Sequence, residues 1–120
     1  MRPDHNCLGA HLFFYCAKAS AAERNRGLPD GMRNTHPTVK PLALMAYLCK
    51  LVAPPGAVIL DPFMGSGSTG VAAQRWRFIG IDQDAEAFAI ARARIDAALD
   101  DVPAPKRAHG QKFLFAGAVP

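Results

Sequence analysis

A glycine-rich turn between two expected secondary-structure elements is the part of the sequence best suited to chemistry. The segment Asp61–Gly70 reads DPFMGSGSTG and joins a short apolar run to an expected helix. Gly65 and Gly67 allow the backbone to turn sharply and to approach a ligand closely. The first N–H groups of the helix that follows have no partner within that helix, so they can donate to the same ligand.

A second carboxylate follows the next apolar run, where Phe78–Ile81 ends in Asp82. An acid at this place can accept hydrogen bonds from both ribose hydroxyls of an adenosine ligand. The alternative is an ordinary tight turn in which Ser68 caps the helix. Because the strand before, the helix after and the acid at the next strand end occur together, the pattern favours a nucleotide-type ligand.

The glycines alone leave the identity of that ligand open. Gly65, Gly67 and Gly70 also satisfy G-x-G-x-x-G, and Asp82 lies 17 residues after Gly65, close to the spacing of a dinucleotide site. A pyrophosphate carrier such as NAD is therefore possible at this point. A P-loop is excluded because no Gly-Lys-Ser/Thr follows the glycines.

The expected elements form a β-α-β-α unit. Pro41 opens a helix that ends at Ala53-Pro54-Pro55-Gly56. The strands and helices that follow are Ala57–Leu60, a helix from Ser68 to Arg75, Phe78–Ile81, and a helix from its cap Asp84 to about Leu99. The connections allow only parallel strands, which makes the fold class α/β.

The ends of the chain carry weaker patterns. His11–Cys16 predicts one buried strand, Lys18–Lys40 a long polar loop, and the residues from Val102 onward a loose tail. We therefore divide the chain into an N-terminal strand region (1–17), a ligand-binding part (18–99) and a tail (100–120). The scattered His5, Cys7, His11 and Cys16 do not have the spacing of a metal site.

Length and composition set broad limits. The 120 residues suffice for one domain, and the net charge of +4 weakly favours an anionic partner such as nucleic acid. Three widely spaced cysteines are typical of a reduced, cytosolic protein. We find neither a signal peptide nor an apolar run long enough to cross a membrane, so we expect a cytoplasmic protein.

The segment His36–Pro41 (HPTVKP), followed by an apolar helix, Pro-Pro-Gly and then DPFMGSGSTG, resembles the DNA amino-methyltransferases, which modify adenine N6 or cytosine N4. The match is to members whose cofactor motif follows the catalytic motif, and it covers about Lys18–Leu99. The resemblance implies a partial Rossmann-like methyltransferase fold that binds S-adenosylmethionine (SAM), and it disfavours NAD. DNA is then the expected partner.

The resemblance also implies roles for single residues. Thr38 and Lys40 would line the pocket for the methionine end of SAM, the loop from Asp61 to Gly67 would hold the methionine portion, and Asp82 would bind the ribose. The implied cofactor residues are Thr38, Lys40, Asp61, Phe63, Gly65, Ser66, Gly67 and Asp82. Simpler alternatives remain for three side chains: Lys40 as a solvated lysine, Thr38 as a local cap, and His36 as a residue that only holds its loop.

One motif of the family is missing from this sequence. The resemblance leads us to expect Asp-Pro-Pro-Tyr or a close variant upstream, and none occurs. We therefore assign no catalytic residue and expect either an enzyme half that needs an N-terminal partner or a non-catalytic remnant. The target base, the recognition sequence and the oligomeric state stay open.

Two further patterns are short. Lys18, Arg24, Arg26 and Arg33 are candidates for phosphate contacts, although a solvated loop explains them equally well. Gln111–Phe115 (QKFLF) resembles the peptides that dock replication sliding clamps. We expect Trp76, which follows a helix end, to pack rather than to stack on a base.

Overall fold

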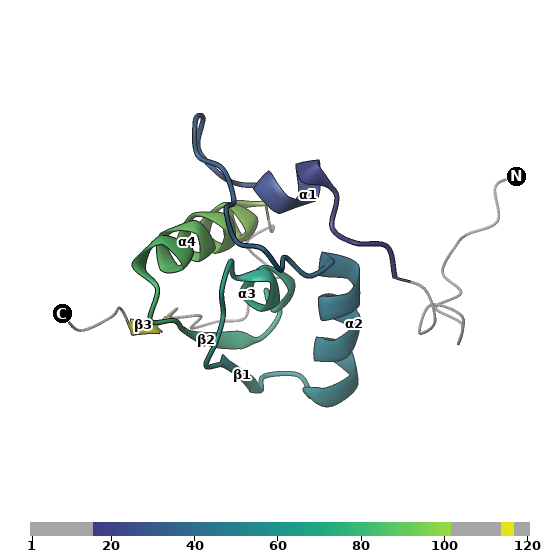
Figure 1. The fold of residues 1–120 in the computed structure, drawn as a ribbon. Helices are drawn as coiled ribbons and strands as arrows, with labels where there is room; N and C mark the ends of the chain where they lie inside the picture. The colour runs from purple at the N-terminus through teal and green to yellow at the C-terminus, as the bar shows by residue number, and fades with distance from the viewer. Residues whose placement is uncertain (1–15, 102–113, 117–120) are drawn as a thin grey trace, which may run out of the picture.

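The computed structural model describes residues 16–101 and the backbone of residues 114–116. The elements are α1 (Ala21–Asn25), α2 (Leu42–Val52), β1 (Val58–Asp61), α3 (Ser68–Ala72), β2 (Arg77–Ile81), α4 (Ala85–Asp100) and β3 (Leu114–Ala116). The strands form one parallel sheet in the order β1-β2-β3 (Figure 1). The prediction of an α/β fold is confirmed.

The unit β1-α3-β2-α4 has the connectivity that the sequence predicts. Val58 pairs with Arg77 and Asp61 with Gly80, so the two strands run parallel and in step. Asp84 caps α4 by accepting from the N–H groups of Glu86 and Ala87, as predicted. Parallel strands bring their carboxyl ends to one edge of the sheet, and this edge is where Asp61 and Asp82 lie.

The core lies between one face of the sheet and the helices α2, α3 and α4 (Figure 1). Phe78 from β2 packs with Ala91 and Ile95 from α4, and all three side chains are buried. Gly70 makes this contact possible, because a Cβ at that position would lie 2.4 Å from Ile95 Cδ1. Trp76 is buried and donates from Nε1 to the carbonyls of Ala53 and Pro54, which confirms its packing role.

The opposite face of the sheet carries exposed apolar side chains. Val58 is 45% exposed, Leu60 58% and Ile81 38%. Among residues 16–101 and 114–116, no helix covers this face (Figure 1). Parallel sheets usually have both faces covered, so the described part of the chain forms two layers where three are usual.

Several local expectations need correction. The segment expected to be a continuous loop contains α1, which begins at the N-cap Ser20 and has no buried residues, so no apolar period reveals it. Ser68 is not a cap: Gly67, at φ +77°, is the N-cap of α3. Cys16 is exposed and outside any strand, whereas residues 1–15 are not described.

The strand β3 lies in the segment expected to be a loose tail. Its backbone pairs in parallel with β2, with Leu114 opposite Ile79 and Ala116 opposite Ile81. Three residues are too few to show a period of two, and the pairing partner lies far away in the chain. The sequence pattern could not reveal such a strand.

Candidate functional site

The Gly-rich loop is a compact turn between the end of β1 and the start of α3. Met64 donates its N–H to the carbonyl of Ile81 in β2, at 3.0 Å, and its side chain is 4% exposed. Gly67 closes the turn by donating to the carbonyl of Met64, at 2.9 Å. Both glycines adopt positive φ, +53° at Gly65 and +77° at Gly67, a region that residues with a Cβ rarely enter.

Asp82 holds this loop from the neighbouring strand. Its Oδ2 accepts from the N–H of Gly65 at 2.8 Å, and its Oδ1 accepts from the N–H of Asp84 at 2.9 Å. A carboxylate has about four acceptor positions, and the hydrogen bonds from the described residues use two of them. The acid at the end of β2 and the glycine loop are therefore in direct contact.

The carboxylate of Asp61 forms hydrogen bonds at both ends of the loop. Its Oδ2 accepts from Thr69 Oγ1 at 2.6 Å and its Oδ1 from the N–H of Phe63 at 3.2 Å. These bonds join the two ends of the loop, since Thr69 belongs to α3. Asp61 thus connects the start of the loop to α3, and its side chain remains partly accessible to solvent.

The other loop side chains point in different directions. Phe63 is 88% exposed, whereas Ser66 is 3% exposed. Ser66 accepts a hydrogen bond from Arg94 through its hydroxyl, at 3.2 Å. Among the predicted cofactor residues, Phe63 is free to contact a ligand, and the hydroxyl of Ser66 faces the interior.

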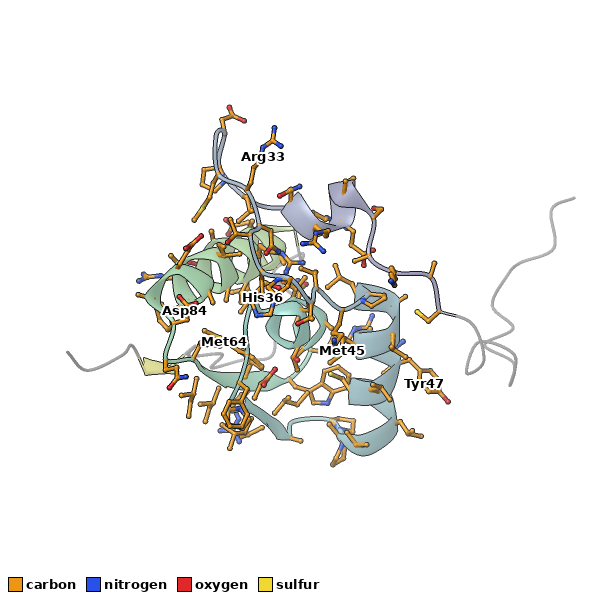
Figure 2. The ribbon with its side chains drawn as sticks, viewed as in Figure 1. Arg33, His36, Met45, Tyr47, Met64 and Asp84 are labelled. Atoms are coloured by element: carbon orange, nitrogen blue, oxygen red, sulfur yellow. The ribbon has the colours of Figure 1, made fainter. Side chains whose placement is uncertain are left out.

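The segment before α2 reaches the loop through His36. A Cβ on Gly65 would lie 2.6 Å from His36 Nε2, so the imidazole lies directly against this glycine. Figure 2 shows His36 and Met64 in the middle of the molecule, between α4 and α2. Thr38 and Lys40 are exposed, and the N–H of Thr38 donates to His36 Nδ1 at 3.3 Å.

The helix α1 holds this segment in place. Arg24 donates from Nη2 to the carbonyl of His36 at 2.8 Å, and Asn34 donates from Nδ2 to the carbonyl of Arg24 at 2.9 Å. Glu23 Oε1 accepts the N–H of Leu42, the first residue of α2, at 2.6 Å. Arg24, a candidate phosphate ligand by sequence, is thus committed to the backbone of His36.

Arg94 is a residue of the site that sequence reasoning missed. As an arginine on α4 it suggests a favourable interaction with the helix dipole, but its side chain is only 1% exposed. It donates from Nη1 to the carbonyl of Ser66 at 2.7 Å. Burial lowers the pKa of its guanidinium below the ordinary value, with Glu23 acting in the opposite direction and Arg24 adding to the decrease. No local pattern distinguishes a buried arginine from an exposed one.

A separate cavity of about 590 Å³ lies between α2, α3 and the second half of α4. Arg94 lines it, together with Arg26, Lys50, Trp76 and small side chains of α4, and none of the predicted cofactor residues does. The cavity is therefore not the predicted cofactor site. Cys49 is in the nearby core, where burial raises the pKa of its thiol, so it is a poor nucleophile.

Two classes of site find no support in the part of the chain that the structure describes. Within it, no group of three or more His, Cys, Asp or Glu side chains could hold a metal ion. No helix there is long and apolar enough to cross a membrane. Of the proposed clamp-binding motif Gln111–Phe115, only the backbone of the last two residues is described.

Comparisons with known proteins agree on one family. Residues 12–93 match the N6/N4 DNA methylase family. The Type II methyltransferase M2.DpnII of Streptococcus pneumoniae is 50% identical over 64 residues, which is 52% of this chain and 24% of that protein. The Type II methyltransferase M2.LlaDCHI of Lactococcus lactis subsp. cremoris is 43% identical over 63 residues, or 51% of this chain and 23% of that protein.

The match spans about a quarter of these relatives' length. The family match, residues 12–93, includes most of the described residues, and with them the loop, Asp82 and His36. The resemblance seen in the sequence is confirmed: this chain belongs to the N6/N4 DNA methylase family.

Proposed function

We propose that this chain is the SAM-binding part of a DNA amino-methyltransferase, with a partial Rossmann-like fold. The observation that carries the proposal is the bond between Asp82 Oδ2 and the N–H of Gly65. It joins the acid at the end of β2 to the glycine turn after β1, at the edge where ligands of parallel α/β sheets bind.

The acceptor positions of Asp82 that the hydrogen bonds from the described residues leave unused suit the two ribose hydroxyls of SAM. The exposed ring of Phe63 offers a flat apolar surface to the adenine. Thr38 and Lys40 stand on the accessible side of the His36 segment, where the lysine would pair with the methionine carboxylate. Asp61, Gly65, Ser66 and Gly67 would form the loop around the methionine portion, with Ser66 acting through its backbone.

When bound, SAM supplies an electrophilic methyl group on a sulfonium centre. The residues of this chain would hold and orient the donor, and none of the described residues is assigned to the target amine. We propose that the groups that accept the N–H bonds of adenine or cytosine and stack on the flipped base come from polypeptide outside this sequence. DNA is the proposed partner of the complete enzyme.

The exposed apolar face formed by Val58, Leu60 and Ile81 is evidence for the proposal that a further polypeptide packs against the sheet. An enzyme half would methylate DNA once its N-terminal partner is added, whereas a non-catalytic remnant or binding module would not. Mixing this chain with the N-terminal part of a relative and measuring methyl transfer to DNA separates the two. Methylation that depends on both chains would support the enzyme half.

Calorimetric titration of SAM into the 120-residue chain tests the proposed function. Wild type should bind saturably, and Asp82→Ala should bind at least about tenfold more weakly, because it loses hydrogen bonds to a charged acceptor. Asp30→Ala, which removes an exposed carboxylate, is the matched control and should bind as wild type does. A folded wild-type chain without affinity for SAM would contradict the proposal.

A further inference from the structure

We propose that Arg94 is a positioning residue that holds the Gly-rich loop in its ligand-binding shape and couples that loop to α1. The inference rests on the proposed SAM site. The guanidinium reaches from α4 to three oxygens at the back of the loop. It donates from Nη1 to the carbonyl and the hydroxyl of Ser66, at 2.7 and 3.2 Å, and lies 3.5 Å from Ser68 Oγ.

The same guanidinium also contacts α1. Its Nη2 donates to the carbonyl of Glu23 at 3.4 Å. One rigid, planar group therefore bridges α4, the loop and α1, which a lysine ammonium on its flexible stem cannot reproduce.

These contacts close into a ring. From Arg94 the ring passes to α1, whose Arg24 donates to the carbonyl of His36 at 2.8 Å. The imidazole of His36 then lies against Gly65, the residue before Ser66 in the loop. Arg94 thus contacts the loop at Ser66 and His36 contacts it at Gly65, and α1 connects the two residues.

The chemistry of Arg94 points to positioning rather than to packing. A buried charge that is not paired with a carboxylate is costly. Within residues 16–101, no carboxylate forms a salt bridge with Arg94, and its Nε has no hydrogen-bond partner there. An apolar side chain would fill this space at lower cost. What the guanidinium adds is its set of oriented N–H groups, aimed at the loop and at α1.

The experiment combines two measurements on the full chain. In the first, amide hydrogen exchange of Arg94→Ala is compared with wild type and with Arg92→Ala, which removes an exposed guanidinium of α4 (64% exposed). Exchange should accelerate together at Gly65, Gly67 and α1 in Arg94→Ala, and at none of them in Arg92→Ala. Acceleration confined to α4, or none, would overturn the proposal.

The second measurement is chemical rescue. Arg94 lines the 590 Å³ cavity, so truncation opens a path by which free guanidinium ions can enter. Arg94→Ala and Arg94→Lys should each bind SAM about tenfold or more weakly than wild type. Millimolar guanidinium should restore slow exchange and SAM affinity to Arg94→Ala, while sodium at equal ionic strength should not.

The outcomes separate the two proposals. If wild type does not bind SAM, the proposed function fails, yet hydrogen exchange and its rescue still test Arg94. If wild type binds SAM and the Arg94 variants bind equally well, the positioning role fails while the proposed function stands. Slower exchange on adding guanidinium to wild type as well would show general stabilisation by the ion and would also overturn the role.

Discussion

At the scale of single residues, the site depends on a close contact that only glycine permits. Gly65 combines φ +53° with a missing Cβ that would lie 2.6 Å from His36 Nε2. Gly31 has a similar positive φ, +84°, but has no atom within 4 Å of the corresponding position. A comparison of alanine substitutions at Gly31 and Gly65 therefore separates the energetic cost of backbone strain from the cost of steric overlap.

Gly65→Ala should destabilise the chain more than Gly31→Ala does. Both substitutions carry a conformational cost of about 1–2 kcal/mol, and Gly65→Ala adds about 1–3 kcal/mol because the His36 ring must move. Urea denaturation measures both values. In a His36→Ala background the two costs should become equal; equal costs in the wild-type background would mean that the imidazole does not lie against the loop.

The cysteines test the core at the same scale. Cys49 is 4% exposed with its thiol pKa raised by burial, whereas Cys16 is exposed. In a Cys7→Ser background, iodoacetamide at pH 8 should modify Cys16 much faster than Cys49. Because the folded state disfavours the Cys49 thiolate, stability should also decrease as pH rises above about 8.5, the thiol pKa of an unfolded chain. Equal labelling of both thiols in the folded chain would place Cys49 outside the core.

At the scale of elements, α1 stabilises the start of α2 through a side-chain cap. The N-cap of α2 is Pro41, which offers no side-chain cap, and Glu23 Oε1 accepts the N–H of Leu42 instead. Glu23→Ala should therefore lower stability by about 1 kcal/mol, the usual value of a cap, while Glu23→Gln, which keeps an acceptor, should lower it less. Thermal unfolding measures both, with Asp30→Ala as the control. No difference between Glu23→Ala and Asp30→Ala would remove the capping role.

The helices and strands differ in how well the sequence alone predicts them. α4 was predictable because its apolar residues face the core with a helical period and Asp84 caps it. β1 and β2 were predictable as short apolar runs that each end at an aspartate, and α2 as an apolar segment bounded by prolines, although Leu60 of β1 and Leu51 of α2 are exposed. α1 was not, since it is held by side-chain hydrogen bonds and buries nothing. The place of Asp82 beside the glycine loop follows from parallel strands, whereas Arg94 becomes part of the site only through the tertiary packing of α4.

At the scale of the whole molecule, one face of the sheet is not covered by any of the described helices, whereas parallel sheets usually have both faces covered. Adjacent residues of β1 point to opposite faces: Ile59 packs against the core, and Leu60 is 58% exposed. Their side chains have similar volumes and lie in the same strand. Threonine at either position gives a β-branched side chain, which suits a strand, so the two variants differ mainly in the contacts that each residue loses on its own face.

Ile59→Thr should destabilise the chain by about 2 kcal/mol or more, because it removes core contacts and buries a hydroxyl. Leu60→Thr should change stability by less than about 0.5 kcal/mol, as exposed substitutions usually do, and should lower binding of a fluorescent apolar dye. Urea denaturation and dye titration on the isolated chain provide the test. If Leu60→Thr were as costly as Ile59→Thr, this face would already be covered in solution. The isolated chain would then not present the apolar surface on which a second polypeptide could complete the sheet.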